Sequence, residues 1–223
     1  MAKAVTQRVI TRYPVILPVR YTTRYRAAVK AGVGWTRYLS VEGANVELDE
    51  RLRPQTPLRL HLETDRGSID VGAKVVWVGE VTPPAGGALH GVVFTQMAPP
   101  QSHALRELLL PLSLVRHAGI RLSVDMPITC QRKGVPGTSL QGRAVDISRG
   151  GLSLRLPRVL PLGTELAVTL STPSEPIRVE GSVVWAESPD RRTVGNLVSH
   201  GLRFTSVDWS VSLAVGLLLA HSN

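Results

Sequence analysis

Cysteine is almost absent from this chain, which has one, Cys130, among 223 residues. An internal disulfide is therefore excluded, and the chain has no cysteine framework of the kind that staples small secreted domains. The first residues, "MAKAVTQRVITRY", have neither the apolar run nor the cleavage site of a secretory signal. These absences favour a protein of the cytoplasm.

Long apolar runs are missing as well. The most apolar stretch is "LAVGLLLA" at 213–220, eight residues long, whereas a helix that spans a bilayer needs roughly 20. We therefore expect no membrane span. Apolar residues still make up 43% of the chain, which is enough for packed cores.

Acidic residues are missing from the first part of the chain, where no acid precedes Glu42. The formal net charge of +9 favours an anionic partner, such as nucleic acid, lipid headgroups or a phosphorylated small molecule. Basic and aromatic residues that alternate are typical of a surface for single-stranded nucleic acid, but also of a strand edge protected by cations. Before Glu42 lie Lys3, Arg8, Arg12, Arg20, Arg24, Arg26, Lys30 and Arg37, together with all four tyrosines, Tyr13, Tyr21, Tyr25 and Tyr38.

Signatures of catalysis are also absent. The six histidines show no metal-ligand spacing, and Cys130 lies in an apolar stretch without the pattern of a nucleophile. His90 and His200 each precede a glycine at the start of an apolar run, which favours a structural role. We therefore expect no enzyme, no metal site and no cofactor.

The chain repeats itself at an offset of about 109 residues. Four landmarks recur in constant order, which indicates a duplicated domain, with Ser40 against Ser148 and Gly43 against Gly151. The paired segments are "RYPVILPV" (12–19) with "RLSVDMPI" (121–128), "YLSVEGANVEL" (38–48) with "DISRGGLSLRL" (146–156), "KVVWVGE" (74–80) with "SVVWAES" (182–188), and "HGVVFTQ" (90–96) with "HGLRFTS" (200–206).

Each copy contains short alternating or apolar runs separated by glycine and proline, which predicts about six strands and a small closed barrel. Trp77 and Trp185 occupy equivalent apolar runs, so we expect both in the cores.

Each copy ends in a helical pattern, at 100–114 with Ser102 as the N-cap and at 207–221 with Asp208 in that place. The predicted domains are residues 1–111 and 112–223, with a hinge at 112–121.

The segment "DISRGG" at 146–151 is typical of a tight turn. Asp146 and Ser148 can bond the backbone nearby, and Gly150 or Gly151 is expected to supply a positive φ.

The order of features in the second copy resembles the PilZ family. An arginine-bearing segment precedes the first strand, D-x-S-x-x-G follows the second strand, and a "VVW" strand and a final "HGLRF" strand lead into a helix. The resemblance covers nearly the whole chain, once per copy, and is stronger in the second. It implies a mainly β fold of two small antiparallel six-stranded barrels, each followed by a C-terminal helix. It also implies cyclic di-GMP as the ligand.

The family's binding signature is R-x-x-x-R before the barrel and [DN]-x-S-x-x-G on its rim. In the second copy, a histidine stands where the first arginine belongs. In the first copy both arginines are present, but Tyr38 stands where the acid belongs. The resemblance implies ligand contacts by Arg116, His117, Arg121, Asp146, Ser148, Arg149, Gly150 and Gly151, and a secondary set of Arg8, Arg12, Ser40 and Gly43.

The chemistry of a cyclic dinucleotide suits these residue types. An arginine can fork onto a phosphate or onto guanine O6 and N7, and a carboxylate can accept from the N1 and N2 donors of guanine. Asp146 would then bind the base and Ser148 a phosphate or the base, while Gly150 and Gly151 leave room for the ligand. For Arg149 a solvated surface position is favoured over a phosphate contact.

Three functions remain open at this stage. The first is a cyclic di-GMP effector that changes its domain arrangement or its binding to a protein partner. The second is an adaptor that has lost the ligand, as Tyr38 and His117 would allow. The third is a basic small barrel that binds single-stranded nucleic acid through the Arg/Tyr cluster before Glu42.

Overall fold

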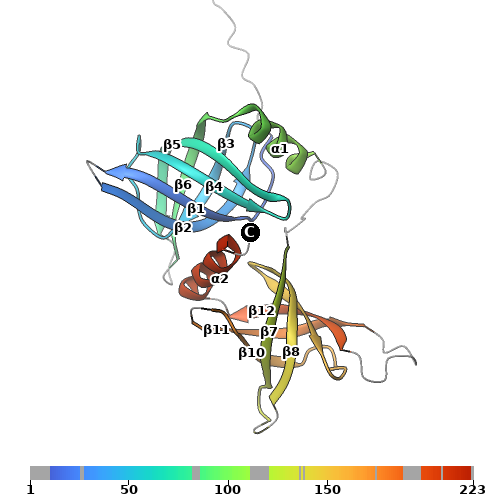
Figure 1. Ribbon diagram of the computed structural model, residues 1–223. Coiled ribbons are helices and arrows are strands. Elements are labelled where there is room, and N and C mark those ends of the chain that lie inside the picture. The colour runs from blue at the N-terminus through green and yellow to red at the C-terminus, as the bar shows by residue number, and fades with distance from the viewer. Residues whose placement is uncertain are drawn as a thin grey trace, which may run out of the picture. The chain divides into compact units, whose positions relative to one another are not determined.

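The computed structural model describes residues 11–25, 28–81, 86–110, 121–135, 137, 139–173, 175–187, 197–206 and 208–221. Two closed β-barrels of six strands account for most of them, and each barrel is followed by a helix (Figure 1). The predicted mainly β fold of two antiparallel barrels with C-terminal helices is confirmed. The chain divides into two compact units, which are described one at a time.

The first barrel joins its strands in the order β1-β2-β3-β6-β5-β4, and β4 closes onto β1. Its elements are β1 (Pro18–Tyr25), β2 (Ala28–Leu39), β3 (Gly43–Leu48), β4 (Pro57–Thr64), β5 (Gly67–Val81) and β6 (Ala88–Gln96), followed by α1 (Pro99–Leu109).

The second barrel repeats this order as β7-β8-β9-β12-β11-β10. Its register repeats as well, because Tyr38 pairs with Asn45 across β2 and β3, and Asp146 pairs with Ser153 across β8 and β9. Its elements are β7 (Leu122–Arg132), β8 (Ser139–Ser148), β9 (Gly151–Leu156), β10 (Glu165–Leu170), β11 (Ile177–Ala186) and β12 (Val198–Ser206), followed by α2 (Trp209–His221).

Each barrel has a core of inward-facing aliphatic side chains. In β10, Leu166, Val168 and Leu170 are fully buried or nearly so and alternate with more exposed residues, as a strand with one face in the core requires. Closing the sheet pairs every strand on both sides and leaves no free edge.

The two helices begin differently. The prediction of Ser102 as an N-cap is wrong, because α1 begins at Pro99 after Ala98, without a side-chain cap. Proline at the start of a helix has the required φ and no N–H left to satisfy. Asp208 caps α2 as predicted, since its Oδ1 accepts from the Val211 amide at 2.8 Å. Neither helix has the length and apolarity that crossing a bilayer would demand, as far as the described residues go.

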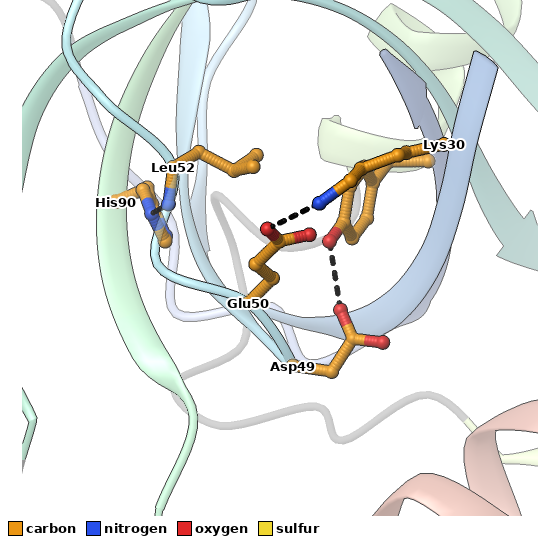
Figure 2. Close-up of polar contacts among 6 residues, drawn as sticks. Lys30, Asp49, Glu50, Leu52 and His90 are labelled. Atoms are coloured by element: carbon orange, nitrogen blue, oxygen red, sulfur yellow. Dashed lines mark hydrogen bonds and ion pairs between the residues drawn. The ribbon is translucent and has the colours of Figure 1, made fainter. Parts of the chain in front are cut away.

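His90 and His200 are fully buried and have the same structural role. The Leu52 amide donates to Nε2 of His90 at 3.0 Å (Figure 2). Nδ1 of His90 lies 2.8 Å from the Ala88 carbonyl oxygen. His200 binds the Leu160 amide and the carbonyl two residues before it in the same way. Each ring is thus neutral with its proton on Nδ1, and burial lowers the pKa of both.

Tyr21 belongs to the core of the first barrel, where its side chain is 1% exposed. Its hydroxyl donates to Asp49 Oδ1 at 2.8 Å, and burial raises the pKa of the phenol. Figure 2 shows Asp49 beside the Lys30–Glu50 ion pair, which has a length of 2.9 Å. One of the four tyrosines that suggested a nucleic-acid surface is therefore unable to stack a base.

Candidate ligand-binding site

The turn between β8 and β9 forms part of the rim of the second barrel. The Ser148 hydroxyl donates to the Gly151 carbonyl oxygen at 3.2 Å and holds the turn. A Cβ on Gly151 would lie 2.2 Å from the Leu202 carbonyl oxygen in β12. Gly151 is therefore required because the backbones of two strands approach closely.

The prediction of a positive φ in this turn is wrong for both glycines, since neither Gly150 nor Gly151 lies in the left-handed region. The Gly150 carbonyl accepts from the Phe204 amide at 3.0 Å, so the turn stays attached to β12. A Cβ on Gly150 would meet no atom within 4 Å, and this position is open.

Arg121 and Asp146 meet beside this turn. Nη1 of Arg121 donates to Asp146 Oδ1 at 2.8 Å and to Ser153 Oγ at 3.0 Å. The arginine comes from the residue before β7, the acid from β8 and the serine from β9. The structure thus brings two of the predicted residues together and adds Ser153, which the family signature does not include.

The ion pair between Arg121 and Asp146 is partly exposed, with side-chain exposures of 47% and 26%. Ion pairs of this kind contribute only about 0–1 kcal/mol. A ligand that offers a phosphate to the arginine and N–H donors to the carboxylate can therefore replace the pair at little cost. The exposed pair is consistent with a site that opens to a ligand.

Arg149 lies inside the rim motif but contacts α2. Its guanidinium carbon is 5.9 Å from the centroid of the Trp209 ring, at the limit of a cation–π contact. The prediction that Arg149 is a solvated surface residue is therefore wrong, because its side chain contacts α2. The indole ring at the start of α2 gives no signal in a motif search, so the sequence alone did not reveal this partner.

Three predicted residues cannot be placed in the site. Arg116, His117 and Arg8 lie outside the described residues.

Trp185 was expected in the core, and this is wrong, because its side chain is 41% exposed. Its ring lies over Gly201, where a Cβ would be 1.9 Å from the indole Nε1. The strand register places Asp146, Ser153, Gly201 and Trp185 in one row across β8, β9, β12 and β11. The exposed indole therefore belongs to the same outer face as the Arg121–Asp146 pair.

The equivalent row of the first barrel is Tyr38, Asn45, Gly91 and Trp77. Trp77 was also expected in the core, but it is 39% exposed and lies over Gly91 as Trp185 lies over Gly201. These side chains and Arg12 line a pocket of about 200 Å³. The first barrel thus keeps a cavity where the second barrel has its ion pair.

Ser40 and Gly43 from the secondary set line the same pocket and form its turn. Ser40 Oγ accepts from the Gly43 amide at 3.1 Å and donates to its carbonyl oxygen at 2.9 Å. A Cβ on Gly43 would lie 2.3 Å from the Val92 carbonyl oxygen. This turn gives a structural reason for the serine and the glycine that the two copies share.

In the described residues, neither the cysteine nor the possible metal ligands indicate a catalytic or metal site. Burial raises the pKa of the Cys130 thiol to about 12, so the thiolate is scarce near neutral pH. Within the ranges given above, no three His, Cys, Asp or Glu residues gather in a way that would hold a metal ion.

Comparison with known proteins identifies a family. The family model described as "PilZ domain" matches residues 6–110 and again residues 116–211. No curated protein sequence matches the chain.

Several solved structures match parts or most of the chain. PlzA of Borreliella burgdorferi in complex with c-di-GMP is 13% identical with a TM-score of 0.42, and the match covers 90% of this chain and 85% of that one. The MrkH–c-di-GMP complex of K. pneumonia is 13% identical with a TM-score of 0.38, covering 90% and 85%. The PilZ domain of Escherichia coli YcgR with c-di-GMP is 15% identical with a TM-score of 0.40, covering 49% and 93%.

Proposed function

Because the chain belongs to the PilZ family and carries the domain twice, we propose that it is a cyclic di-GMP effector, a binding protein and not an enzyme. The second barrel holds the ligand. The observation that supports this most strongly is that Arg121 bonds Asp146 and Ser153, which lie on the same outer face as the exposed Trp185.

The residues on this face and in the adjacent turn suit different parts of the ligand. Arg121 can turn from Asp146 to fork onto a phosphate or onto a guanine edge. Asp146, once released, accepts from guanine N1 and N2, and the open face of Trp185 stacks on a purine. Gly150 leaves the rim open, while Ser148 holds the turn and presents its hydroxyl close by.

The segment before the second barrel completes the site. Arg116 and His117 contact the bound ligand. Ligand capture alters the arrangement of the domains or the binding of a protein partner, and the protein acts in the cytoplasm. Residues 1–111 and 112–223 are the two working units.

The first barrel does not take cyclic di-GMP. Tyr38 occupies the place of Asp146 in the strand register. A phenol is neutral near pH 7 and cannot accept two guanine protons as a carboxylate does.

Calorimetric titration of the full chain with cyclic di-GMP tests the proposal. Asp146→Ala and Arg121→Ala should each abolish binding or weaken it at least tenfold. The matched controls are Glu180→Ala and Lys133→Ala, which break another exposed ion pair of the same barrel and should bind like the parent. The site is wrongly assigned if the first pair of variants also binds like the parent.

A parent chain that gives no heat with cyclic di-GMP would instead support the adaptor without a ligand. Binding of an oligonucleotide that weakens steeply with salt would support the nucleic-acid function.

A further inference from the structure

The pocket of the first barrel has a chemistry of its own. Its walls include Tyr38 and Trp77, two aromatic side chains that are 46% and 39% exposed. Exposed apolar side chains that lie next to one another often mark a ligand-binding groove. Two of them beside one cavity therefore point to a flat ligand.

The Trp77 ring is held in a position that leaves one of its faces available for stacking. The ring lies directly over Gly91, where any Cβ would come within 1.9 Å of the indole Nε1. One face of the indole is thus covered by the barrel backbone, and the other remains available. An aromatic face held in this way stacks with a base and loses little side-chain entropy.

Polar groups surround the stacking surface. Asn45, between Tyr38 and Trp77 in the strand order, offers an amide donor and an acceptor side by side, a pattern that matches the edge of a purine. Glu42, also in the lining, can accept from a ring amino group. Arg12 at the pocket supplies a cation for a phosphate.

The size of the pocket limits the ligand. A volume of about 200 Å³ is below the roughly 300–1,000 Å³ typical of pockets for drug-sized ligands. There is room for one ring system, whereas cyclic di-GMP carries two guanines. We propose that the first barrel binds a single purine mononucleotide, stacked on Trp77, with Asn45 at its edge and Arg12 at its phosphate.

This site is independent of cyclic di-GMP binding by the second barrel. The test uses the full chain, labelled with nitrogen-15, and follows the indole N–H signals of its four tryptophans while AMP or GMP is added to millimolar concentration. One signal should shift and saturate, and Trp77→Phe should remove that signal. Trp185→Phe, the matched change in the second barrel, should remove a different signal and leave the titration unchanged.

A second pair of variants tests the polar contact. Asn45→Ala should weaken nucleotide binding at least tenfold, while Ser153→Ala at the equivalent position of the second barrel should not change it. Asp146→Ala should leave it intact, which separates this site from the cyclic di-GMP site. The proposal is overturned if neither nucleotide shifts the Trp77 signal, if ribose 5-phosphate shifts it equally well, or if Asn45→Ala binds like the parent.

Discussion

The two barrels share one scaffold and differ in the side chains it presents. Both have a serine and a glycine in the rim turn, a buried histidine, and a tryptophan lying over a glycine. In the first two places of the row, however, the second barrel has Asp146 and Ser153, whereas the first has Tyr38 and Asn45. The serine, the glycine and the histidine are therefore residues that the fold requires. Each barrel also offers an exposed indole, and the choice of ligand lies in the positions that differ.

The rim glycines should give the largest effect. Gly151→Ala forces a Cβ against the Leu202 backbone in β12, so we expect a loss of stability of roughly 1–3 kcal/mol and the loss of cyclic di-GMP binding. Gly43→Ala should destabilise the first barrel by a similar amount but preserve binding.

Thermal unfolding and calorimetry measure the two effects separately. Gly150→Ala is the matched control, because its Cβ would meet nothing within 4 Å. Equal stability of Gly150→Ala and Gly151→Ala would contradict the close approach of the strands.

The histidines should give an effect common to both barrels. Burial lowers the folded-state pKa of His90 and His200 below 6.5. As pH falls below about 6.5, the unfolded chain takes up protons that the folded chain refuses. The contribution of the two histidines to the free energy of unfolding should therefore be complete above that pH. It should decline below that pH until the pH reaches the folded-state pKa.

Each histidine can contribute at most about 1.4 kcal/mol per pH unit. Urea unfolding at several pH values between 7.5 and 5 measures the decline. His200→Gln should leave only the part due to His90, and a stability that rises on acidification would rule out neutral buried rings.

The tryptophan platforms should give a smaller effect on binding. Gly201→Ala pushes the Trp185 ring off the barrel surface, and this should weaken cyclic di-GMP binding three- to tenfold, about 0.7–1.4 kcal/mol. Stability should change little, because the side chain that must move is partly exposed. Gly91→Ala makes the same change beneath Trp77 and should leave cyclic di-GMP affinity unaltered. If Gly201→Ala binds like the parent, Trp185 does not contact the ligand.

His117 should give a modest effect. A histidine is mostly neutral at pH 7.5 and cannot fork onto a phosphate, so His117→Arg should tighten binding by two- to threefold, about 0.5 kcal/mol. The parent should bind better near pH 6 than near pH 8 for the same reason. An unchanged affinity together with a large loss in Arg116→Ala would show that Arg116 already has this role.

The arginines of the first copy should give the smallest effect. Alanine at both Arg8 and Arg12 should leave cyclic di-GMP affinity unchanged, because the first barrel takes no part in that site. A tenfold loss, about 1.4 kcal/mol, would instead indicate a ligand site shared by the two copies.

The internal repeat of the sequence was enough to predict the features that both copies share. The offset of the two copies predicted both barrels, the equivalence of Ser40 with Ser148 and the structural role of His90 and His200. These features depend on the order of residues along the chain and on positions that recur in both copies.

The sequence did not predict contacts made across the sheet. Trp185 is in an apolar run, and only the strand register shows that it lies over Gly201 on the outer face. Ser153 joins Arg121 through pairing between β8 and β9, which the motif does not contain. The motif predicts a positive φ at Gly150 or Gly151, although the actual constraint on Gly151 is the backbone of β12.

The most direct test of the division between the barrels is cyclic di-GMP calorimetry on the two halves expressed separately, with circular dichroism to confirm that each is folded. Residues 112–223 should bind with an affinity close to that of the full chain, and residues 1–110 should give no binding heat. Binding by 1–110, or a folded 112–223 that does not bind, would contradict the assignment of the cyclic di-GMP site to the second barrel.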